Sequence, residues 1–232
     1  MRLGIMGGTF DPIHIGHVAI ARLARAEAGL ERVIFLPDGD PPHKSPRASG
    51  AHRLEMARLA TEGEGCFEVS DMELSRPGRT YTVDSLTALT DMYPGSGLHY
   101  IIGSDTLFQF PTWKTAEKVA RLCRMLVALR PGDDGAAIRA QQEDLLARYG
   151  LQTALLRGCV PDVSSSRIRA LAREGRSIDG LVPPPVAAYI AAHGLYRSPA
   201  WRQGIPADII LHGQGHGRQR NRRRPAQRAN VA

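Results

Sequence analysis

The chain has 232 residues, of which 43% are hydrophobic and 23% charged, enough to bury the core of one domain with or without an appendage. No segment approaches the roughly 20 consecutive apolar residues that span a bilayer, and the N-terminus lacks a signal-peptide pattern, so we expect a cytoplasmic protein. The three cysteines match neither a disulfide framework nor a zinc-binding pattern.

The net charge of +7 is concentrated at the C-terminal end. Of the 30 lysines and arginines, six lie in residues 212–232, which contain no acid, so the remaining 24 nearly balance the 23 acidic residues. We expect residues 1–197 to form the folded domain and residues 198–232 an extension, disordered and arginine-rich from about residue 212. The extension is either a solvated appendage or a salt-sensitive attachment to nucleic acid or another acidic partner.

Short apolar runs typical of buried strands occur at 3–6, 33–36, 67–72, 98–102, 125–129 and 153–156. Segments with helical periodicity or good helix formers lie between them, at 17–28, 51–61, 83–92, 115–121 and 136–149, and two more helices are expected at 166–173 and 185–192. This alternation predicts an α/β fold: a Rossmann-like, doubly wound parallel sheet with helices on both faces. Ligands bind at the carboxyl ends of strands in such sheets, so residues directly after each run are the first candidates for a site.

The stretch GGTFDPIHIGH occupies the first of these strand ends. Gly7 and Gly8 are expected to let the backbone turn and approach a ligand, and Thr9 adds a hydroxyl. The usual phosphate loops, GxGxxG and GxxxxGK[ST], are both absent from this stretch. It therefore predicts a ligand loop of another kind.

His14 and His17 follow in the same stretch, three residues apart at the start of the predicted helix. Their imidazoles are expected to share one face of the first turn, with Gly16 leaving room for a guest. The helix dipole and unpaired N–H groups favour an anion there, so phosphate is the expected ligand. Exposed caps or part of a metal site are the alternatives, although no carboxylate or cysteine lies at helical spacing beside the pair.

Polar and aromatic residues follow other predicted strands. DGDPPHKSP brings His43 and Lys44 into a proline-stiffened loop after the second run, and Asp105 follows Gly103 after the fourth, where a carboxylate can accept from a ribose hydroxyl or a base amine. Trp113 offers a flat face for stacking an aromatic ring, although a core tryptophan would give the same pattern.

A second candidate anion site lies far along the chain, in VSSSRIRALAREG. Serines stand at a predicted helix start with Arg167 and Arg169 behind them, which combines N–H groups, hydroxyls and a guanidinium. Arg169 is the better candidate, and the spacing does not exclude Arg167. Together with the strand ends, this segment predicts a site for a polyphosphate, a ribose and an aromatic ring. No nucleophile is accompanied by a base and an orienting acid, which favours direct attack by a substrate phosphate on a nucleotide α-phosphorus.

Several motifs follow one another between Met1 and Tyr196: GGTFDPIHIGH, PPHK, RTYTVDSL, IIGSD with a tryptophan after it, SSSRIR and YIAAHGLY. In this order they resemble the nucleotidyltransferase family with the (H/T)xGH signature, and within it the bacterial branch that acts on pyridine mononucleotides. The resemblance implies a nucleotidyltransferase-type fold and the transfer of AMP from ATP to nicotinate mononucleotide, giving deamido-NAD and pyrophosphate in NAD biosynthesis. It also implies that Mg²⁺ accompanies the phosphates.

The resemblance implies roles for particular residues as well. His14, His17 and Arg169 would be catalytic. ATP would contact Gly8, Thr9, Phe10, Gly103, Asp105, Ser165 and Ser166. The mononucleotide would contact His43, Lys44, Tyr81, Thr82 and Trp113, with Lys44 reaching either its phosphate or the triphosphate. No residue is expected to ligate a metal directly. Ser85 and Ser166 stand where relatives often carry threonine, and both keep the hydroxyl.

Other functions fit parts of the sequence. The amide mononucleotide is an alternative substrate. HIGH also occurs in class I aminoacyl-tRNA synthetases, but a KMSKS-like segment is absent and the chain is too short for an anticodon-binding domain. Pantetheine-phosphate adenylyltransferases and cytidylyltransferases fit the motifs less well. A nucleotide-sensing protein that binds nucleic acid through its basic tail is a further alternative, and the oligomeric state, a homo-oligomer included, stays open.

Overall fold

The computed structural model describes residues 1–41 and 45–197. His43, Lys44 and the extension at 198–232 lie outside the described residues. Six strands form one sheet in the order β3-β2-β1-β4-β5-β6, and every pairing is parallel. The strands are β1 (Arg2–Gly8), β2 (Arg32–Pro37), β3 (Phe67–Val69), β4 (Gly97–Gly103), β5 (Cys123–Ala128) and β6 (Thr153–Leu156). The predicted doubly wound parallel sheet is confirmed, and the strand order reverses between β1 and β4.

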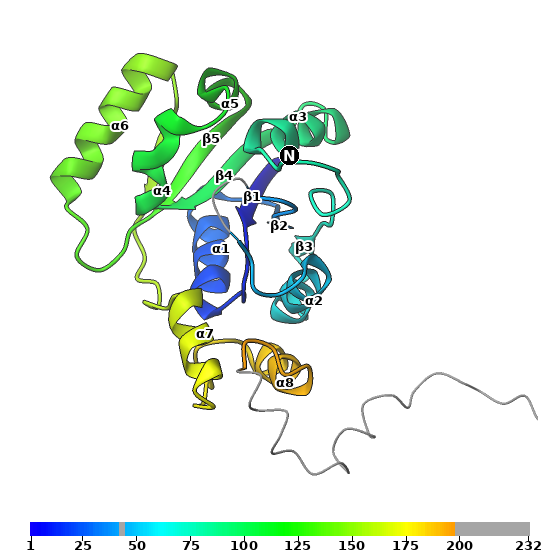
Figure 1. The fold of residues 1–232 in the computed structure, drawn as a ribbon. Helices are drawn as coiled ribbons and strands as arrows, with labels where there is room; N and C mark the ends of the chain where they lie inside the picture. The colour runs from blue at the N-terminus through cyan, green and yellow to red at the C-terminus, as the bar shows by residue number, and fades with distance from the viewer. Residues whose placement is uncertain (42–44, 198–232) are drawn as a thin grey trace, which may run out of the picture. The chain divides into compact units, whose positions relative to one another are not determined.

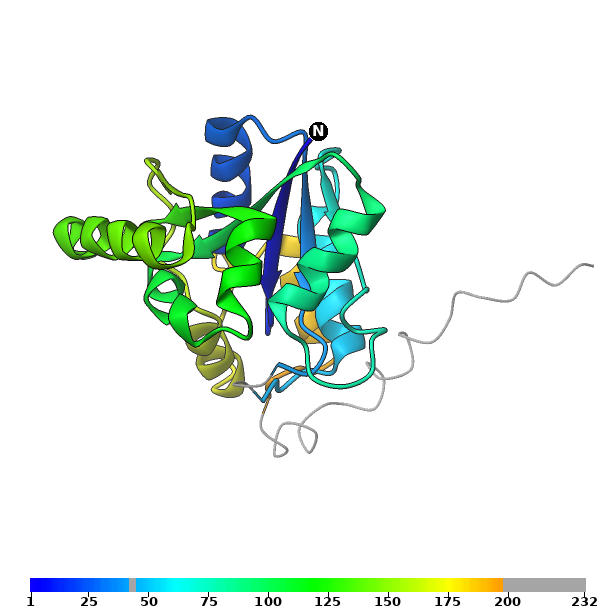
Figure 2. The ribbon, with the colours of Figure 1, turned by 90° about the horizontal axis from the view of Figure 1, so that it is seen from above.

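Helices cover both faces of this sheet (Figure 1). They are α1 (Ile15–Ala28), α2 (Gly50–Thr61), α3 (Thr82–Met92), α4 (Ser104–Gln109), α5 (Ala116–Leu122), α6 (Gly135–Tyr149), α7 (Ser165–Arg173) and α8 (Pro184–Ala192). Figure 2 shows α1 on one side of the strands and α3 on the other. One apolar cluster joins the sheet to α1, α2, α7 and α8, and a second joins it to α3, α5 and α6.

The alternation of side chains along β2 explains how one strand serves both clusters. Val33 and Phe35 pack into the first cluster, and Ile34 and Leu36 into the second. All four side chains are at most 1% exposed. A strand buried on both faces needs apolar residues at every position, which is why VIFL reads as a continuous apolar run.

The predicted helices begin and end where local capping permits. Ser49, Asp134 and Ser164 are N-caps whose side chains accept hydrogen bonds from first-turn N–H groups. Gly29 and Gly150 end α1 and α6 with φ of 60° and 68°, the left-handed conformation that glycine adopts without steric cost. The bounds of the seven predicted helices differ from the observed bounds by at most two residues at either end.

Two features of the chain differ from the expectation. The third strand, expected at 67–72, ends at Val69, because the chain then leaves the sheet in a turn closed by a bond from the Ser75 N–H to the Asp71 carbonyl. The helix α4 and the short 3₁₀ helix Phe110–Thr112 were not predicted, since both are too short to show a helical period. Among the described residues, no helix has the length and apolar character needed to cross a membrane.

Candidate active site

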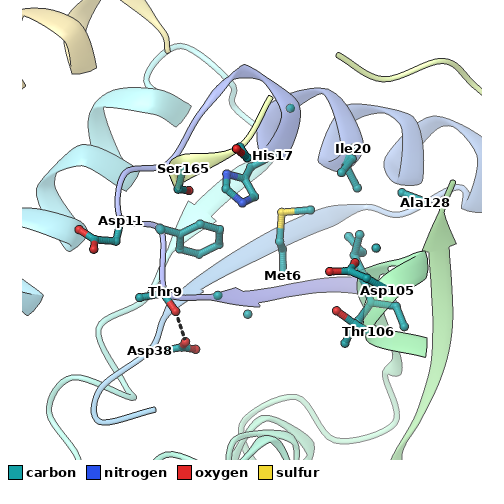
Figure 3. A pocket seen from close by; sticks show the side chains of 18 of the residues that line it. Met6, Thr9, Asp11, His17, Ile20, Asp38, Asp105, Thr106, Ala128 and Ser165 are labelled. Atoms are coloured by element: carbon teal, nitrogen blue, oxygen red, sulfur yellow. Dashed lines mark hydrogen bonds between the residues drawn. The ribbon is translucent and has the colours of Figure 1, made fainter. Parts of the chain in front are cut away.

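A pocket of about 1210 Å³ opens over the carboxyl ends of the central strands, where the strand order reverses (Figure 3). It is lined by every predicted site residue that the structure describes: Gly8, Thr9, Phe10, His14, His17, Tyr81, Thr82, Gly103, Asp105, Trp113, Ser165, Ser166 and Arg169. His43 and Lys44 lie outside the described residues, so their expected contacts stay a prediction. The volume exceeds that of a pocket for one small ligand, and residues from both ends of the domain share it.

His14 and His17 stack on one another at the start of α1. Their ring centroids are 3.7 Å apart with planes inclined by 26°, and His14 is the N-cap of the helix. The backbone N–H of His14 donates to Nδ1 of His17 at 3.2 Å. That bond places the proton of a neutral His17 on Nε2. Phe10 meets His17 edge-on at 5.1 Å, so this imidazole is held between two rings.

Burial makes His14 a neutral imidazole. Its side chain is 7% exposed, and this burial, with a smaller contribution from the positive charge of Arg130, lowers the pKa of His14 to about 4. Negative charge brought next to the pair would favour the protonated form and turn His14 into a donor at both nitrogens.

The glycines of the first loop make room for the protein's own atoms. Gly7 and Gly8 remain in β1, and the backbone turn that we expected at them comes later, with Phe10 in the left-handed region at φ of 48°. A Cβ at Gly7 would lie 2.2 Å from the hydroxyl of Tyr100, and one at Gly8 would lie 3.2 Å from the Phe10 ring. The expectation that these two glycines supply the turn was therefore wrong.

Gly16 was likewise expected to leave space for a ligand. A Cβ there would approach Nδ1 of His14 to 3.0 Å and the backbone oxygen of Pro161 to 3.2 Å. The missing side chain thus lets the His14 ring fold back against α1, and lets the segment before α7 approach the helix.

The helix α7 docks onto the loop between β1 and α1, as Figure 1 shows. The hydroxyl of Ser165 donates to the carbonyl of Pro12 at 2.9 Å, and Nη1 of Arg169 donates to the carbonyl of Asp11 at 2.7 Å. Figure 3 shows Ser165 beside His17 at one end of the pocket. Arg169 thus shares the pocket with the histidine pair, as the sequence predicts, whereas Arg167 is exposed and does not line the pocket.

Asp105 and Arg130 form an ion pair at another part of the pocket wall. Oδ1 of Asp105 lies 3.1 Å from Nη2 of Arg130, and the two side chains are 52% and 58% exposed. Asp105 lies in the first turn of α4, and Figure 3 shows it across the pocket from Ser165. We did not predict Arg130, although it follows β5 closely and inspection of that strand end would have found it.

The aromatic end of the pocket contains Trp113 and Tyr81. Trp113 packs edge-on against Tyr100 at 5.7 Å, and its side chain remains partly exposed. Lys114 lies 4.1 Å from the centre of the Tyr81 ring and 3.7 Å from the carboxylate of Asp84. Lys114, which also lines the pocket, was not predicted, and its position next to Trp113 in the sequence was the available signal.

A buried acid lies in the wall at this end. Glu73 is 3% exposed, its Oε1 accepts the hydroxyl proton of Ser85 at 2.6 Å, and its Oε2 has no partner. Burial raises the pKa of Glu73 to about 7, against the opposing effect of the Ser85 hydrogen bond. Sequence reasoning missed this residue, because an acid within VSDMELS gives no sign that it is enclosed.

Arg53 connects the first two strand ends from inside the protein. It is 2% exposed, and its guanidinium donates to the carbonyls of Thr9 at 2.8 Å and Asp38 at 2.7 Å. Thr9 also donates its hydroxyl proton to the Asp38 carboxylate at 2.9 Å, the bond drawn in Figure 3. Burial lowers the pKa of Arg53, while Asp38 and Asp11 act against that shift. Neither Arg53 nor Asp38 was predicted.

The α1 and α7 end of the pocket offers several hydrogen-bond donors to an anion. In residues 1–41 and 45–197, no group of three or more histidine, cysteine, aspartate and glutamate side chains is arranged to hold a metal ion. The groups at the α1 and α7 end are imidazoles, hydroxyls, a guanidinium and helix N-termini. This set of groups suits a phosphate chain.

Comparisons with known proteins agree with this description. A model of the cytidylyltransferase-like family matches residues 5–171. A Pelobacter propionicus protein named "probable nicotinate-nucleotide adenylyltransferase" is 40% identical over 214 residues, covering 84% of this chain and 98% of its own. A protein of the same name from Thermomicrobium roseum is 44% identical over 202 residues, covering 85% and 92%. The structure of Plasmodium falciparum nicotinic acid mononucleotide adenylyltransferase complexed with NaAD shares the fold, with a TM-score of 0.68 at 18% identity over 84% of this chain and 97% of that one.

Proposed function

This chain belongs to the cytidylyltransferase-like family, among the nicotinate-nucleotide adenylyltransferases, and we propose that its pocket transfers AMP from ATP to nicotinate mononucleotide. A phosphate oxygen of the mononucleotide bonds to the α-phosphorus of ATP while the bond to the β-phosphate oxygen breaks, which yields deamido-NAD and pyrophosphate. The observation that carries the proposal is the convergence of His14, His17 and Arg169 on a pocket that also contains Trp113.

The triphosphate is assigned to the end formed by α1 and α7. Nε2 of His17 and the guanidinium of Arg169 donate to phosphate oxygens, with the hydroxyls of Ser165 and Ser166 beside them. The two helix N-termini add the positive ends of their dipoles. Donors that are already in place when negative charge gathers on the phosphoryl oxygens and the leaving pyrophosphate lower the barrier without reorganisation.

The adenosine is assigned to the segment after β4. Asp105 and its partner Arg130 present a carboxylate and a guanidinium at the pocket surface, and each side chain is more than half exposed. A carboxylate there accepts from ribose hydroxyls or the base amine. Gly103 brings the backbone close, and its missing side chain also admits Asp105, whose Oδ1 would lie 2.7 Å from a Cβ at that position.

The pyridine ring is assigned to the face of Trp113, and its carboxylate to the start of α3. Tyr81 is the N-cap of that helix and makes no side-chain cap, and its carbonyl already accepts the N–H of Asp84, so the N–H groups of Thr82 and Val83 are the first-turn donors that an acceptor can use. A carboxylate benefits from the helix dipole there and an uncharged amide does not. Lys114 adds positive charge beside Tyr81. These contacts support preference for the acid mononucleotide.

Mg²⁺ enters this proposal as part of the substrate, bound to ATP. The α1 and α7 end carries donors to phosphate, and in nucleotide sites Mg²⁺ binds the substrate phosphates and keeps several waters. The ion neutralises part of the phosphate charge. His14, His17 and Arg169 position the chain and stabilise the charge that remains.

A pyrophosphate-release assay tests the proposed function. The full chain is given ATP and Mg²⁺ with either nicotinate mononucleotide or nicotinamide mononucleotide. We expect kcat/KM for the acid to exceed that for the amide by about tenfold or more, the worth of one charged hydrogen bond. Preference for the amide would reassign the substrate, and absence of pyrophosphate with both would refute the activity.

We also propose that residues 1–197 contain the whole catalytic domain. The pocket residues to which the reaction is assigned, from Gly8 to Arg169, all lie within that range. A chain that ends at residue 197 should keep wild-type kcat/KM. Loss of adenylyl transfer in a truncated chain that still folds would place part of the chemistry in the extension.

A further inference from the structure

The carboxylate of Asp11 is enclosed by hydrogen-bond donors from distant parts of the chain. Its side chain is 4% exposed. Oδ2 accepts the backbone N–H of Arg47 at 2.7 Å, and Oδ1 accepts that of Ala48 at 3.1 Å. The hydroxyl of Tyr196, 185 residues along the chain, donates to Oδ1 at 2.8 Å.

Arg169 lies beside this carboxylate but is bonded to a different oxygen. Its Nη1 donates to the backbone carbonyl of Asp11 at 2.7 Å, and its Nη2 donates to Ser166 at 3.2 Å. Figure 3 shows the Asp11 side chain turned away from His17 and from the centre of the pocket. An arginine next to an aspartate normally takes the carboxylate itself, often with two bonds, so this arrangement needs an explanation.

The donors on Asp11 supply that explanation. Bonded to two backbone N–H groups and a phenol, the carboxylate is satisfied where it lies and gains little by rotating toward Arg169. If Arg169 took the carboxylate, its charge would be neutralised and it would lose affinity for phosphate. Of the three donors, the Tyr196 hydroxyl is the only one that belongs to a side chain, and it bonds the oxygen with the longer backbone contact.

Tyr196 is itself held in a conformation that local sequence does not favour. Its φ is 66°, in the left-handed region that a residue with a Cβ seldom adopts. Such a conformation persists where surrounding contacts impose it, and it is common beside functional sites. Burial and the neighbouring Asp11 raise the pKa of Tyr196, so the phenol keeps its proton and remains a donor at all working pH values.

We propose that Tyr196 is a positioning residue for ATP, whose hydroxyl holds the Asp11 carboxylate on the backbone of residues 47–48 and so prevents it from neutralising Arg169. The choice of ATP as the anion rests on the proposed function. The last residues of the folded domain thereby control the charge available to the triphosphate, although Tyr196 does not line the pocket.

The test is the affinity of the full chain for ATP in the presence of Mg²⁺, measured by titration calorimetry without a mononucleotide. Tyr196→Phe removes only the hydroxyl, and we expect the Kd for ATP to rise about tenfold. Tyr189→Phe is the matched control, because that hydroxyl contacts His52 at 2.9 Å and not the pocket. It should bind ATP as the wild type does. A Tyr196→Phe protein with a lowered melting temperature but wild-type ATP affinity would overturn the proposal.

A double-mutant cycle separates positioning from general loosening. In an Arg169→Ala background, Tyr196→Phe should raise the Kd for ATP by less than about twofold, because the guanidinium that the Tyr196 hydroxyl protects is absent. A further tenfold loss there would overturn the proposal. Asp11→Asn provides a second cycle, because it removes the competing negative charge. Adding Tyr196→Phe to that variant should again change the Kd for ATP by less than about twofold. A rise of about tenfold in the Kd there would count against the mechanism.

These measurements remain informative if the proposed function fails. A wild-type chain that binds ATP without adenylylating nicotinate mononucleotide would refute the reaction and leave the role of Tyr196 testable. A chain that adenylylates the mononucleotide normally after Tyr196→Phe, with unchanged KM for ATP, would refute the role of Tyr196 alone.

Discussion

The imidazoles of His14 and His17 lie in contact, with ring centroids 3.7 Å apart, at the positive end of α1. The two rings both line the pocket but differ in environment: His14 is almost fully buried, while Nδ1 of His17 already accepts the backbone N–H of His14. The pair therefore offers one oriented donor and one imidazole whose protonation depends on what enters the pocket.

Replacing His17 by alanine should reduce kcat by about 10²- to 10³-fold, the usual cost of losing one donor to transition-state charge. The melting temperature should change little, because the ring mainly contacts other pocket residues. Steady-state pyrophosphate release and a thermal melt measure the two effects. His52→Ala, which alters a histidine outside the pocket, is the control, and a His17→Ala enzyme within threefold of the control would contradict the role.

The buried His14 should make the protein less stable in acid. Its pKa is about 4 in the folded chain against 6.5 in an exposed histidine. The unfolded chain therefore binds more protons between these values, and stability falls as the pH drops from 6.5 toward 4, by roughly 3 kcal/mol. Denaturant unfolding of the wild type and His14→Gln across this range measures the difference. Parallel pH profiles for the two proteins would contradict the assignment.

Glu73 should act in the opposite direction. Its pKa of about 7 in the folded chain exceeds the ordinary 4.5, so its stabilising effect is complete below pH 4.5 and is lost as the pH rises to 7, by roughly 3 kcal/mol. Glu73→Gln keeps an acceptor for Ser85 and does not ionise. We expect its free energy of unfolding, relative to the wild type, to increase across that range. Glu143→Gln, at an exposed position, should show no such trend, and a flat profile for Glu73→Gln would refute the buried-acid description.

Replacing Trp113 by alanine should raise KM for the mononucleotide by about tenfold, since stacking on an aromatic ring contributes about 1–3 kcal/mol. The KM for ATP should change much less. Because Trp113 also packs on Tyr100 and Phe110, the assay is run well below the melting temperature of the variant. Phe108→Ala, at an exposed aromatic 47% accessible on α4, is the control. Equal effects on both substrates would indicate a loosened pocket and contradict stacking.

The order of strands and helices was predictable because each is encoded locally. A run such as VIFL in β2 has no polar residue because helices cover both faces of the sheet, and the bounds of α1 and α6 follow from glycines that stop them. The motif GGTFDPIHIGH placed the histidine pair at a strand end, and the serines and Arg169 stood out because their residue types suit phosphate. The short α4 and the early end of β3 were not predicted, because each segment is too short to show a detectable hydrophobic period.

The sequence by itself determined the alternation of elements and the chemical character of the strand ends, because periodicity, capping and side-chain chemistry are properties of neighbouring residues. Only the tertiary structure decided which distant groups meet: Tyr196 on Asp11, Arg53 between two strand ends, Arg130 against Asp105, and Glu73 enclosed with half of its carboxylate unpartnered. Burial and partner identity set the charge of a side chain and the direction in which it points, and both arise when segments far apart in the chain pack together.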